Sequence, residues 1–344
     1  MHNDYQAAAG KRVLVTGAAG FIASHVADHC LAQGMDVVAT DDLSGGFIEN
    51  VPRKAQFLQG DLRSPEFVAS LWAGGRFDYV YHLGAYAAEG LSHFIRRFNY
   101  QTNLVASINL INQAIVNECD CFVFTSSIAV YGRNQVPMTE DLVPQPEDPY
   151  GISKYAVELD LRSAHEMFGL DSVVFRPHNV YGERQNIADR YRNVIGIFMN
   201  QLLQNQPMTI FGDGSQTRAF SHIDDVAPII AQSAIVPAAR NRVFNVGADT
   251  PYTVNQLAED VARALGKPLN VEHLPPRNEV LHAFADHSRV RETFHPSSPL
   301  SLEVGLQRMA DWVLGHGPAQ PTVFEAIEIE RNLPPSWRPS IVAR

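Results

Sequence analysis

Cysteine is scarce in this chain: Cys30, Cys119 and Cys121 are the only three among 344 residues. So few cysteines are typical of a reducing compartment and exclude a disulfide framework. The spacing of Cys119 and Cys121 does not match a zinc site, and the thirteen histidines form no metal-ligand cluster along the sequence. We therefore expect no metal.

Long apolar runs and an excess of positive charge are also lacking. No stretch approaches the ~20 apolar residues of a membrane span, and residues 1–10 contain neither the basic region nor the apolar core of a signal peptide. The net charge of −10 disfavours nucleic acid and anionic membranes as partners. These absences predict a cytoplasmic globular protein that does not associate with a membrane.

The N-terminal segment has the pattern of strand, glycine turn, helix, strand and acid. Residues 12–16 form a β-rich apolar run typical of a buried parallel strand, and residues 36–40 form the next one. Between them, Gly17 permits a tight turn, and Gly20 lets the backbone approach a pyrophosphate at the helix N-terminus. Asp41 stands where a carboxylate would hold the ribose hydroxyls and repel a 2′-phosphate, which favours NAD over NADP. Asp42 is the alternative ribose ligand.

Strand-like and helical segments alternate along the first half of the chain. We expect strands at 55–59, 78–82, 121–125 and 172–176, and helices at 64–72, 99–117 and 148–168. This alternation predicts an α/β fold with a doubly wound parallel sheet, in which ligands bind at the carboxyl ends of the strands. Gly17, Asp41 and Asp61 fall at such ends.

The second half has a looser pattern, with a helix expected at 194–205, strands at 208–211 and 243–246, and a helix at 254–265. We expect a Rossmann-type NAD-binding domain over residues 11–182. Residues 183–318 are expected to form mainly a smaller C-terminal α/β substrate-binding lobe, with some segments returning to the first domain. Residues 319–344 lose periodicity and are expected to form a tail.

Tyr150 and Lys154 are four residues apart on the helix expected at 148–168, so their side chains share one face. An ammonium beside a phenol favours the ionised form of the phenol, whose ordinary pKa is about 10. A tyrosine tuned in this way can act as a base near neutral pH.

With these residues assembled, the chain resembles the extended short-chain dehydrogenase/reductase family, in particular its NAD-dependent sugar-nucleotide epimerases and dehydratases. The resemblance runs from about residue 12 to about residue 312. Five ordered motifs carry it: GAAGFIA at 17–23, SSIAVYG at 126–132, PYGISK at 149–154, RPHNVYG at 176–182 and TRAFSHIDDV at 217–226. Two departures are Ala23, where the family usually has a third glycine, and Gly84, where paired alanines are usual.

The resemblance implies a role for each matched residue. Ser127, Tyr150 and Lys154 form the catalytic set, with Ser126 or Thr125 as the fallback for Ser127. The implied cofactor-binding residues are Gly17, Gly20, Phe21, Ile22, Asp41, Asp42, Asp61, Leu62, Leu83, Ala85, Asn103, Tyr150 and Lys154. The implied substrate-binding residues are Ser127, Asn179, Asn193, Phe211, Arg218 and Arg277.

The family also implies an oxidation at C4 of the sugar, and its branches differ in the groups that follow the catalytic serine. Similar dehydratases carry an Asp-Glu pair there, and GDP-mannose 3,5-epimerases carry a cysteine; this chain has Ile128 and Ala129. Neither can transfer a proton, which elimination and C3/C5 epimerisation require. Epimerisation at C4 of a nucleotide-activated hexose is therefore expected, unless a base such as His178, Glu183 or His222 comes from another segment.

Three further expectations follow from the resemblance. Ala283 lies in a segment similar to the one that bounds the C2 pocket, so a small side chain there would admit UDP-GlcNAc as well as UDP-glucose. A 4-keto-sugar reductase and a non-catalytic NAD sensor are the alternatives, and the intact Ser127, Tyr150 and Lys154 set disfavours the sensor. A homodimer through the helices at 99–117 and 148–168 is implied as well.

Overall fold

A seven-stranded parallel sheet forms the centre of the computed structural model, which describes residues 8–133, 135–276 and 280–338. Its strand order is β11-β6-β5-β4-β1-β2-β3, and every neighbouring pair is parallel. The strands are β1 (Arg12–Thr16), β2 (Asp36–Asp41), β3 (Gln56–Gln59), β4 (Tyr79–His82), β5 (Cys121–Thr125), β6 (Ser172–Pro177) and β11 (Arg242–Val246). The sequence prediction of a doubly wound α/β fold is confirmed.

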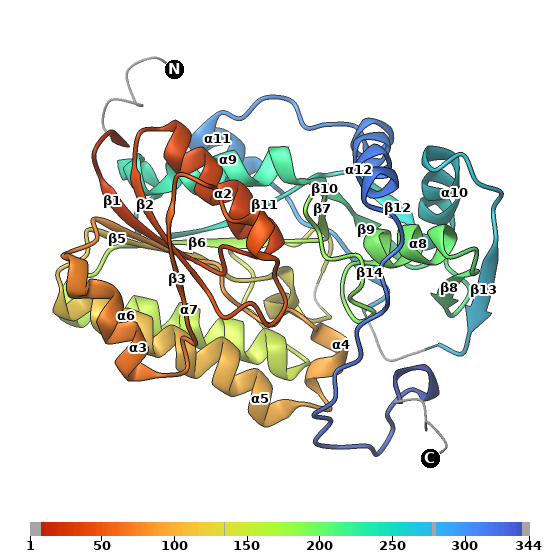
Figure 1. Cartoon of the computed structure of the whole chain (residues 1–344), viewed down its shortest axis with the longest axis horizontal. Helices are drawn as coiled ribbons and strands as arrows, with labels where there is room; N and C mark the ends of the chain where they lie inside the picture. Colours follow the sequence, from red (N-terminus) through yellow and green to blue (C-terminus); the bar gives the residue numbers. More distant parts are fainter. Residues whose placement is uncertain (1–7, 134, 277–279, 339–344) are drawn as a thin grey trace.

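Helices cover both faces of this sheet (Figure 1). One face carries α3 (Pro65–Leu71), α6 (Ala106–Val116) and α7 (Pro149–Phe168), with α4 (Glu89–Ser92) and α5 (Arg96–Tyr100) at its end. The other carries α2 (Phe21–Ala32), α9 (Ile223–Gln232) and α11 (Ser288–Phe294). Each face buries its own apolar cluster against the β-branched and aromatic side chains of the strands. These two cores hold the strands and helices in place. They thereby position the carboxyl ends of the strands, where the glycine turn and the start of the helix that carries Tyr150 lie close together.

Part of the second half of the chain contributes to this sheet and its helical cover. β11 forms its edge beside β6, and α9 packs on α2. The remainder builds a smaller layer with its own apolar cluster. This layer contains α8 (Val194–Leu203), α10 (Val254–Ala264), α12 (Leu302–His316), β7 (Val180–Tyr181), β8 (Met208–Phe211), β9 (Thr217–Ala219), β10 (Ser221–His222), β12 (Pro251–Thr253), β13 (Val271–Leu274) and β14 (His282–Ala283).

The helix expected at 99–117 is interrupted. A π-helical turn, Gln101–Val105, separates α5 from α6. Asn103 in this turn points inward and is 1% exposed, and its side chain bonds both backbone groups of Tyr86. One extra residue in the turn brings the amide to that backbone, which the periodicity of the sequence could not indicate.

The last described residues form an extended segment that packs on the rest of the molecule. Residues 319–338, which we call the C-terminal arm, run from the end of α12 across the front of the molecule to α4 and α5 (Figure 1). The arm contains one 3-10 turn, Pro335–Trp337, and the other short 3-10 turns are Ile48–Asn50, Trp72–Gly74, Ile128–Tyr131, Ser233–Ile235 and Pro237–Ala239. Over the described part of the chain, no helix combines the length and apolarity needed to cross a membrane.

Candidate active site

A cavity of about 630 Å³ opens at the carboxyl ends of the central strands. Of the nineteen residues expected at the site, the structure brings seventeen together in its wall. They are Gly17, Gly20, Phe21, Ile22, Asp41, Asp42, Asp61, Leu62, Leu83, Ala85, Ser127, Tyr150, Lys154, Asn179, Asn193, Phe211 and Arg218. Asn103 lies behind the wall, and Arg277 falls outside the described residues.

The glycine turn after β1 has the shape of a phosphate-binding turn. Gly17 has a φ of 71°, and a Cβ there would lie 2.7 Å from the Cα of Gly84. A Cβ on Gly20 would lie 2.9 Å from the Gly17 carbonyl oxygen. α2 begins after Gly20 with no side chain capping its first turn and no acidic residue in it, so its N–H groups and dipole face the cavity without a competing anion. The turn therefore fits the diphosphate of a dinucleotide.

Carboxylates stand at the expected adenosine end of the cavity. Asp41 accepts hydrogen bonds from the backbone N–H groups of Ala19 (3.1 Å) and Leu43 (2.8 Å), which fixes its orientation. Burial raises the pKa of Asp41 and these hydrogen bonds oppose that rise. Asp61 pairs with Arg63 at 2.6 Å, and the hydrogen bond from Arg63 lowers the pKa of Asp61. A carboxylate held at the end of β2 fits the two hydroxyls of an NAD ribose.

Ser127, Tyr150 and Lys154 meet at the ends of β5 and the start of α7. Asp148 caps α7 by accepting from the Gly151 N–H at 2.9 Å, and this sets the register that turns Tyr150 and Lys154 inward. The Lys154 ammonium donates to the Thr125 carbonyl at 2.8 Å and lies 5.9 Å from the centroid of the Tyr150 ring. Both side chains are buried.

The protonation of this set differs from the simple sequence expectation. Burial raises the pKa of Tyr150, and a hydrogen bond with Ser127 opposes the rise. Burial also lowers the pKa of Lys154 to about 7, because the charged form loses water, while the charge of Glu158 opposes this. In the chain alone, desolvation thus outweighs the lowering of the Tyr150 pKa that the spacing suggested.

A buried ion pair lies directly behind the catalytic set. The Arg176 guanidinium donates to both oxygens of Glu158, with Nε to Oε1 at 3.0 Å and Nη2 to Oε2 at 2.5 Å. The Ser126 hydroxyl donates to Oε1 at 2.5 Å. The pair joins β6 to α7 one helical turn beyond Lys154, so it fixes the helix that carries the catalytic side chains. Sequence reasoning did not identify it.

A second polar network supports the floor of the cavity. The Ser107 hydroxyl donates to the Asn103 carbonyl at 2.8 Å and therefore accepts from Nε2 of His82, also at 2.8 Å. Nδ1 of His82 then accepts from the Thr16 hydroxyl at 2.7 Å, which in turn accepts from the Gly84 N–H at 3.1 Å. Burial lowers the pKa of His82 to about 3, so the ring is neutral. Asn103 thus shapes the cavity indirectly, because it holds the backbone of Tyr86, which lines the cavity.

The substrate half of the wall comes from the later segments. Asn179 and Asn193 adopt positive φ angles of 41° and 63°, and their amides donate to the carbonyls of Ala219 and Val180. Arg218 donates to the carbonyls of Val280 and Leu281 beside β14. Phe211 is the last residue of β8. Asparagine tolerates this backbone region better than most residues, so both positions suit its side chain.

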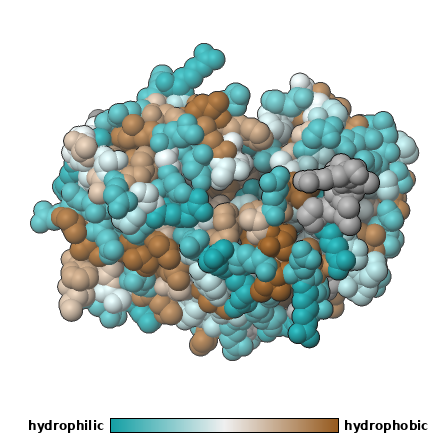
Figure 2. All heavy atoms as spheres, turned by 60° about the horizontal axis from the view of Figure 1, so that its bottom comes forward, coloured by the Kyte–Doolittle hydropathy of each residue, from teal (hydrophilic) through white to brown (hydrophobic). Residues whose placement is uncertain are grey.

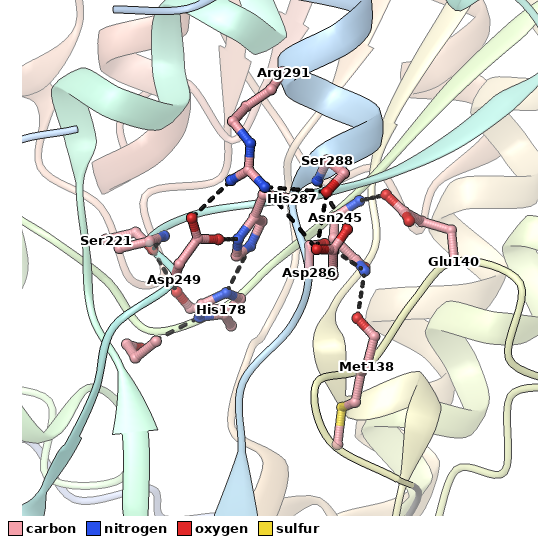
Figure 3. Close-up of polar contacts among 12 residues, drawn as sticks. Met138, Glu140, His178, Ser221, Asn245, Asp249, Asp286, His287, Ser288 and Arg291 are labelled. Carbon is pink, nitrogen blue, oxygen red and sulfur yellow. Dashed lines mark hydrogen bonds and ion pairs between the residues drawn. The ribbon is translucent and has the colours of Figure 1, made fainter. Parts of the chain in front are cut away.

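Beneath this wall, a polar cluster ties β6, β11 and α11 together (Figure 3). Nε2 of His178 lies 3.0 Å from Nε2 of His287, whose Nδ1 lies 2.6 Å from Asp249. Nδ1 of His178 lies 3.3 Å from the Ala219 carbonyl oxygen. Arg291 donates to the second oxygen of Asp249 at 2.7 Å. Both ring nitrogens of His178 are therefore engaged within the protein.

Tyr86, Glu89 and Arg192 are among the further residues that line the cavity wall. Tyr86 follows Ala85 on the segment that Asn103 holds. The charges of Glu89 and Arg192 act on the Tyr150 hydroxyl in opposite directions, Glu89 raising its pKa and Arg192 lowering it. Glu89 begins the short helix α4 and Arg192 stands in an irregular segment, neither within a motif, so only their charges could have pointed to them.

A Rossmann-type sheet with a dinucleotide turn and a Tyr-Lys pair at its strand ends defines the extended short-chain dehydrogenase/reductase class. Within that class, the chain belongs to the NAD-dependent epimerase/dehydratase family, whose model matches residues 13–247. NAD is therefore its cofactor.

Known proteins resemble the chain over most of its length. It is 33% identical over 309 residues to a UDP-glucose 4-epimerase of Mycolicibacterium smegmatis, covering 88% of this chain and 98% of that protein. The crystal structure of a Thermotoga maritima UDP-glucose 4-epimerase with UDP-glucose superposes with a TM-score of 0.83 at 32% identity, covering 89% and 99% of the two chains. A UDP-N-acetylglucosamine 4-epimerase of Methanobrevibacter ruminantium, in complex with UDP-N-acetylmuramic acid, gives 0.80 at 32%, covering 90% and 99%.

Proposed function

We propose that the protein catalyses NAD-dependent epimerisation at C4 of a nucleotide-activated hexose through a transient 4-keto sugar. One observation carries this proposal: Tyr150 and Ser127 line the NAD cavity, while the adjacent Ile128 and Ala129, which also line it, offer no second proton-transfer group. A single acid/base suffices for C4 epimerisation, because the same proton and the same hydride leave and return.

The residues of the catalytic set divide the work. Tyr150 takes the proton from the C4 hydroxyl and, after the keto sugar has rotated, returns it to the same oxygen as the hydride returns to the opposite face of C4. The Ser127 hydroxyl donates a hydrogen bond to the reacting oxygen, and Lys154 holds its positive charge beside the phenol. Bound NAD supplies the hydride acceptor, and its positively charged nicotinamide ring favours the ionised form of a nearby phenol.

The alternative bases considered from the sequence are engaged elsewhere. Both ring nitrogens of His178 have partners, and burial lowers its pKa to about 3. Glu183 is paired with His222 and Arg308, and the hydrogen bond with His222 lowers its pKa to about 2. Neither Glu183 nor His222 is among the described residues that line the cavity. These observations favour C4 epimerisation over dehydration and over C3/C5 epimerisation.

Asp148 and Glu89 are carboxylates that the competing chemistries could use, because both line the same cavity and the charge of each raises the pKa of Tyr150. Turnover in D₂O separates the possibilities. Epimerisation at C4 by direct hydride return leaves the carbon-bound hydrogens of the product unlabelled. Elimination and C3/C5 epimerisation would exchange a carbon-bound hydrogen with solvent, so deuterium in the product, detected by mass spectrometry, would refute the proposal.

For the substrate, we propose UDP-glucose and UDP-galactose or their N-acetyl forms. Ala283 lines the cavity where β14 pairs with Arg218 of β9, and it presents a methyl group at this wall. We expect Ala283→Tyr to lower turnover of UDP-GlcNAc relative to UDP-glucose by tenfold or more. The test is a coupled assay over UDP-, GDP-, CDP- and dTDP-sugars; an unchanged ratio of the two activities would remove Ala283 from the argument, and turnover of none of them would refute the function.

We further propose that the protein is a cytoplasmic homodimer. Apolar side chains interrupt the polar surface on the face that carries α6 and α7 (Figure 2), including Val105, Val116, Ile152 and Leu159. A helix face of this kind is stabilised when it is covered by a second copy. Leu159→Glu should give a monomer in analytical ultracentrifugation, whereas Leu314→Glu, at an exposed leucine of α12, should not.

A further inference from the structure

The C-terminal arm is packed against two segments that border the cavity, residues 86–98 and residues 186–193. At its start it is fixed to α8, since the Asn200 side chain bonds both the N–H and the carbonyl of Ala319 at 2.9 Å. It then bonds the segment 186–193, where the Thr322 N–H donates to the Ala188 carbonyl at 2.9 Å. The arm thus passes from the smaller layer to α4 and α5 (Figure 1).

Aromatic contacts and one carboxylate hold the rest of the arm in place. Trp337 is 5% exposed and meets the ring of Tyr191 edge-on at 5.4 Å. Phe324 packs against Tyr86 at 5.4 Å and Phe98 at 5.0 Å. The carboxylate of Glu328 accepts from the N–H groups of Arg97 and Phe98 at the start of α5. Burying these rings orders both border segments.

Arg192 stands where those two segments meet. Its Nε donates to Asp189 at 2.6 Å, and its guanidinium lies 5.0 Å from the centroid of the Tyr86 ring. Within the part of the chain that the structure describes, its two terminal amino groups donate no hydrogen bond, although Arg192 lines the cavity and its side chain is only 23% exposed. A guanidinium fixed at Nε with both Nη groups available is arranged to bind an anion.

The terminal amino groups of Arg192 lie near the loop that packs on the phosphate-binding turn. A Cβ built on Gly45 would lie 3.4 Å from Nη2 of Arg192. The neighbouring Gly46 is packed on the phosphate-binding turn so closely that a Cβ there would lie 2.5 Å from the Ala19 carbonyl, and the Phe47 N–H donates to that carbonyl at 2.9 Å. Arg192 therefore lines the cavity close to the phosphate-binding turn.

We propose that Arg192 binds the diphosphate of NAD beside the glycine turn, and that the C-terminal arm is the element that positions it. The arm orders Tyr86 and the 186–193 segment, and these hold the guanidinium in place. The chemistry recognised is a diphosphate, which the nucleotide sugar also carries, so the test must separate the two sources. The inference rests on NAD binding and not on the identity of the sugar.

The test compares NAD release from purified holoenzymes. Arg192→Gln removes the cation, and Trp337→Ala loosens the arm without touching the cavity. Exposed Arg263 on α10 supplies the charge-matched control, Arg263→Gln. Release is followed as the exchange of bound NAD for isotopically labelled NAD, and the KM for UDP-glucose is measured separately at saturating NAD.

We expect Arg192→Gln and Trp337→Ala to release NAD at least tenfold faster than the wild type, with Arg263→Gln unchanged. Raising the ionic strength should speed release from the wild type more than from Arg192→Gln, because screening weakens the contact that the variant lacks. Unchanged release from Arg192→Gln would overturn the proposal, as would a raised KM for UDP-glucose with NAD retained, which would assign Arg192 to the substrate. Faster release from Arg192→Gln with wild-type release from Trp337→Ala would overturn the role of the arm. NAD exchange needs no turnover, so it can be judged even if every sugar tested proves to be a non-substrate.

Discussion

The buried pair of Glu158 and Arg176 allows a stability prediction that also reaches the chemistry. Their side chains are 5% and 4% exposed, so water screens neither charge. Removing one partner leaves the other buried and uncompensated, which costs about 3–5 kcal/mol of unfolding free energy. Replacing both by apolar residues of similar volume removes both desolvation penalties and is about neutral.

A double-mutant cycle measures this directly. We expect Glu158→Leu and Arg176→Met each to lower the unfolding free energy by about 3–5 kcal/mol, and the double variant to recover most of that loss. Urea unfolding followed by tryptophan fluorescence at 25 °C, with NAD removed from all four proteins, gives the coupling energy. Single losses below about 1 kcal/mol, or losses that simply add in the double variant, would show that the pair is not a desolvated unit.

The double variant should regain stability without regaining activity. Glu158 opposes the desolvation that lowers the pKa of Lys154 to about 7, so its loss lowers that pKa further. The ammonium is present below the pKa and is lost as the pH rises through it. The alkaline limb of the pH profile of kcat should therefore move to lower pH in the double variant. A stable double variant with the wild-type profile would contradict the electrostatic role of Glu158.

Three further predictions concern the site itself. Tyr150→Phe should lower kcat by about 10²–10⁴-fold while the bound NAD and the fold are retained, and full activity in that variant would refute the mechanism. Gly17→Ala should abolish NAD retention and destabilise the fold, because the added methyl group meets the backbone of Gly84 at 2.7 Å. Gly10→Ala is its matched control, since Gly10 has a similar φ of 77° and an added Cβ there meets no atom of the described residues within 4 Å. It should cost only the ~1–2 kcal/mol of left-handed strain. Lys154→Met should gain most stability over the wild type at and below pH 7, where the wild type bears the full cost of burying the ammonium. That gain should shrink as the pH rises from about 7 toward 10.5, the ordinary lysine pKa that holds in the unfolded chain, and a difference in unfolding free energy that is independent of pH would contradict this.

The fold and most of the cavity wall were predictable from the sequence because their determinants are local. The glycine turn, the acid after β2 and the Tyr-Lys spacing on α7 each follow from the order of residues within one strand, turn or helix. The parallel sheet then brings them together, since the carboxyl ends of its strands share one edge. No knowledge of distant contacts was needed.

The features that escaped prediction depend on contacts between distant segments. The π-helical turn at Asn103 exists because Tyr86 offers two backbone groups to its amide. The C-terminal arm has no periodicity, and Trp337 finds its place only because Phe94 and Tyr191 lie together. The pKa of Lys154 follows burial, which a helical spacing does not report.

The two sides of the cavity suit the two demands of the proposed reaction. The cofactor must stay bound until the hydride has been returned. The keto sugar must meanwhile rotate within the site, so that its other face meets the cofactor. Close backbone packing meets the first demand: Gly17 lies on Gly84, and Gly46 lies on Ala19. Small or unreactive side chains at the other side, Ala129 and Ala283 among them, leave room for the second. If this division is correct, substitutions that loosen the arm should raise the escape of reduced NAD during turnover, whereas enlarging Ala129 should slow epimerisation with the cofactor retained.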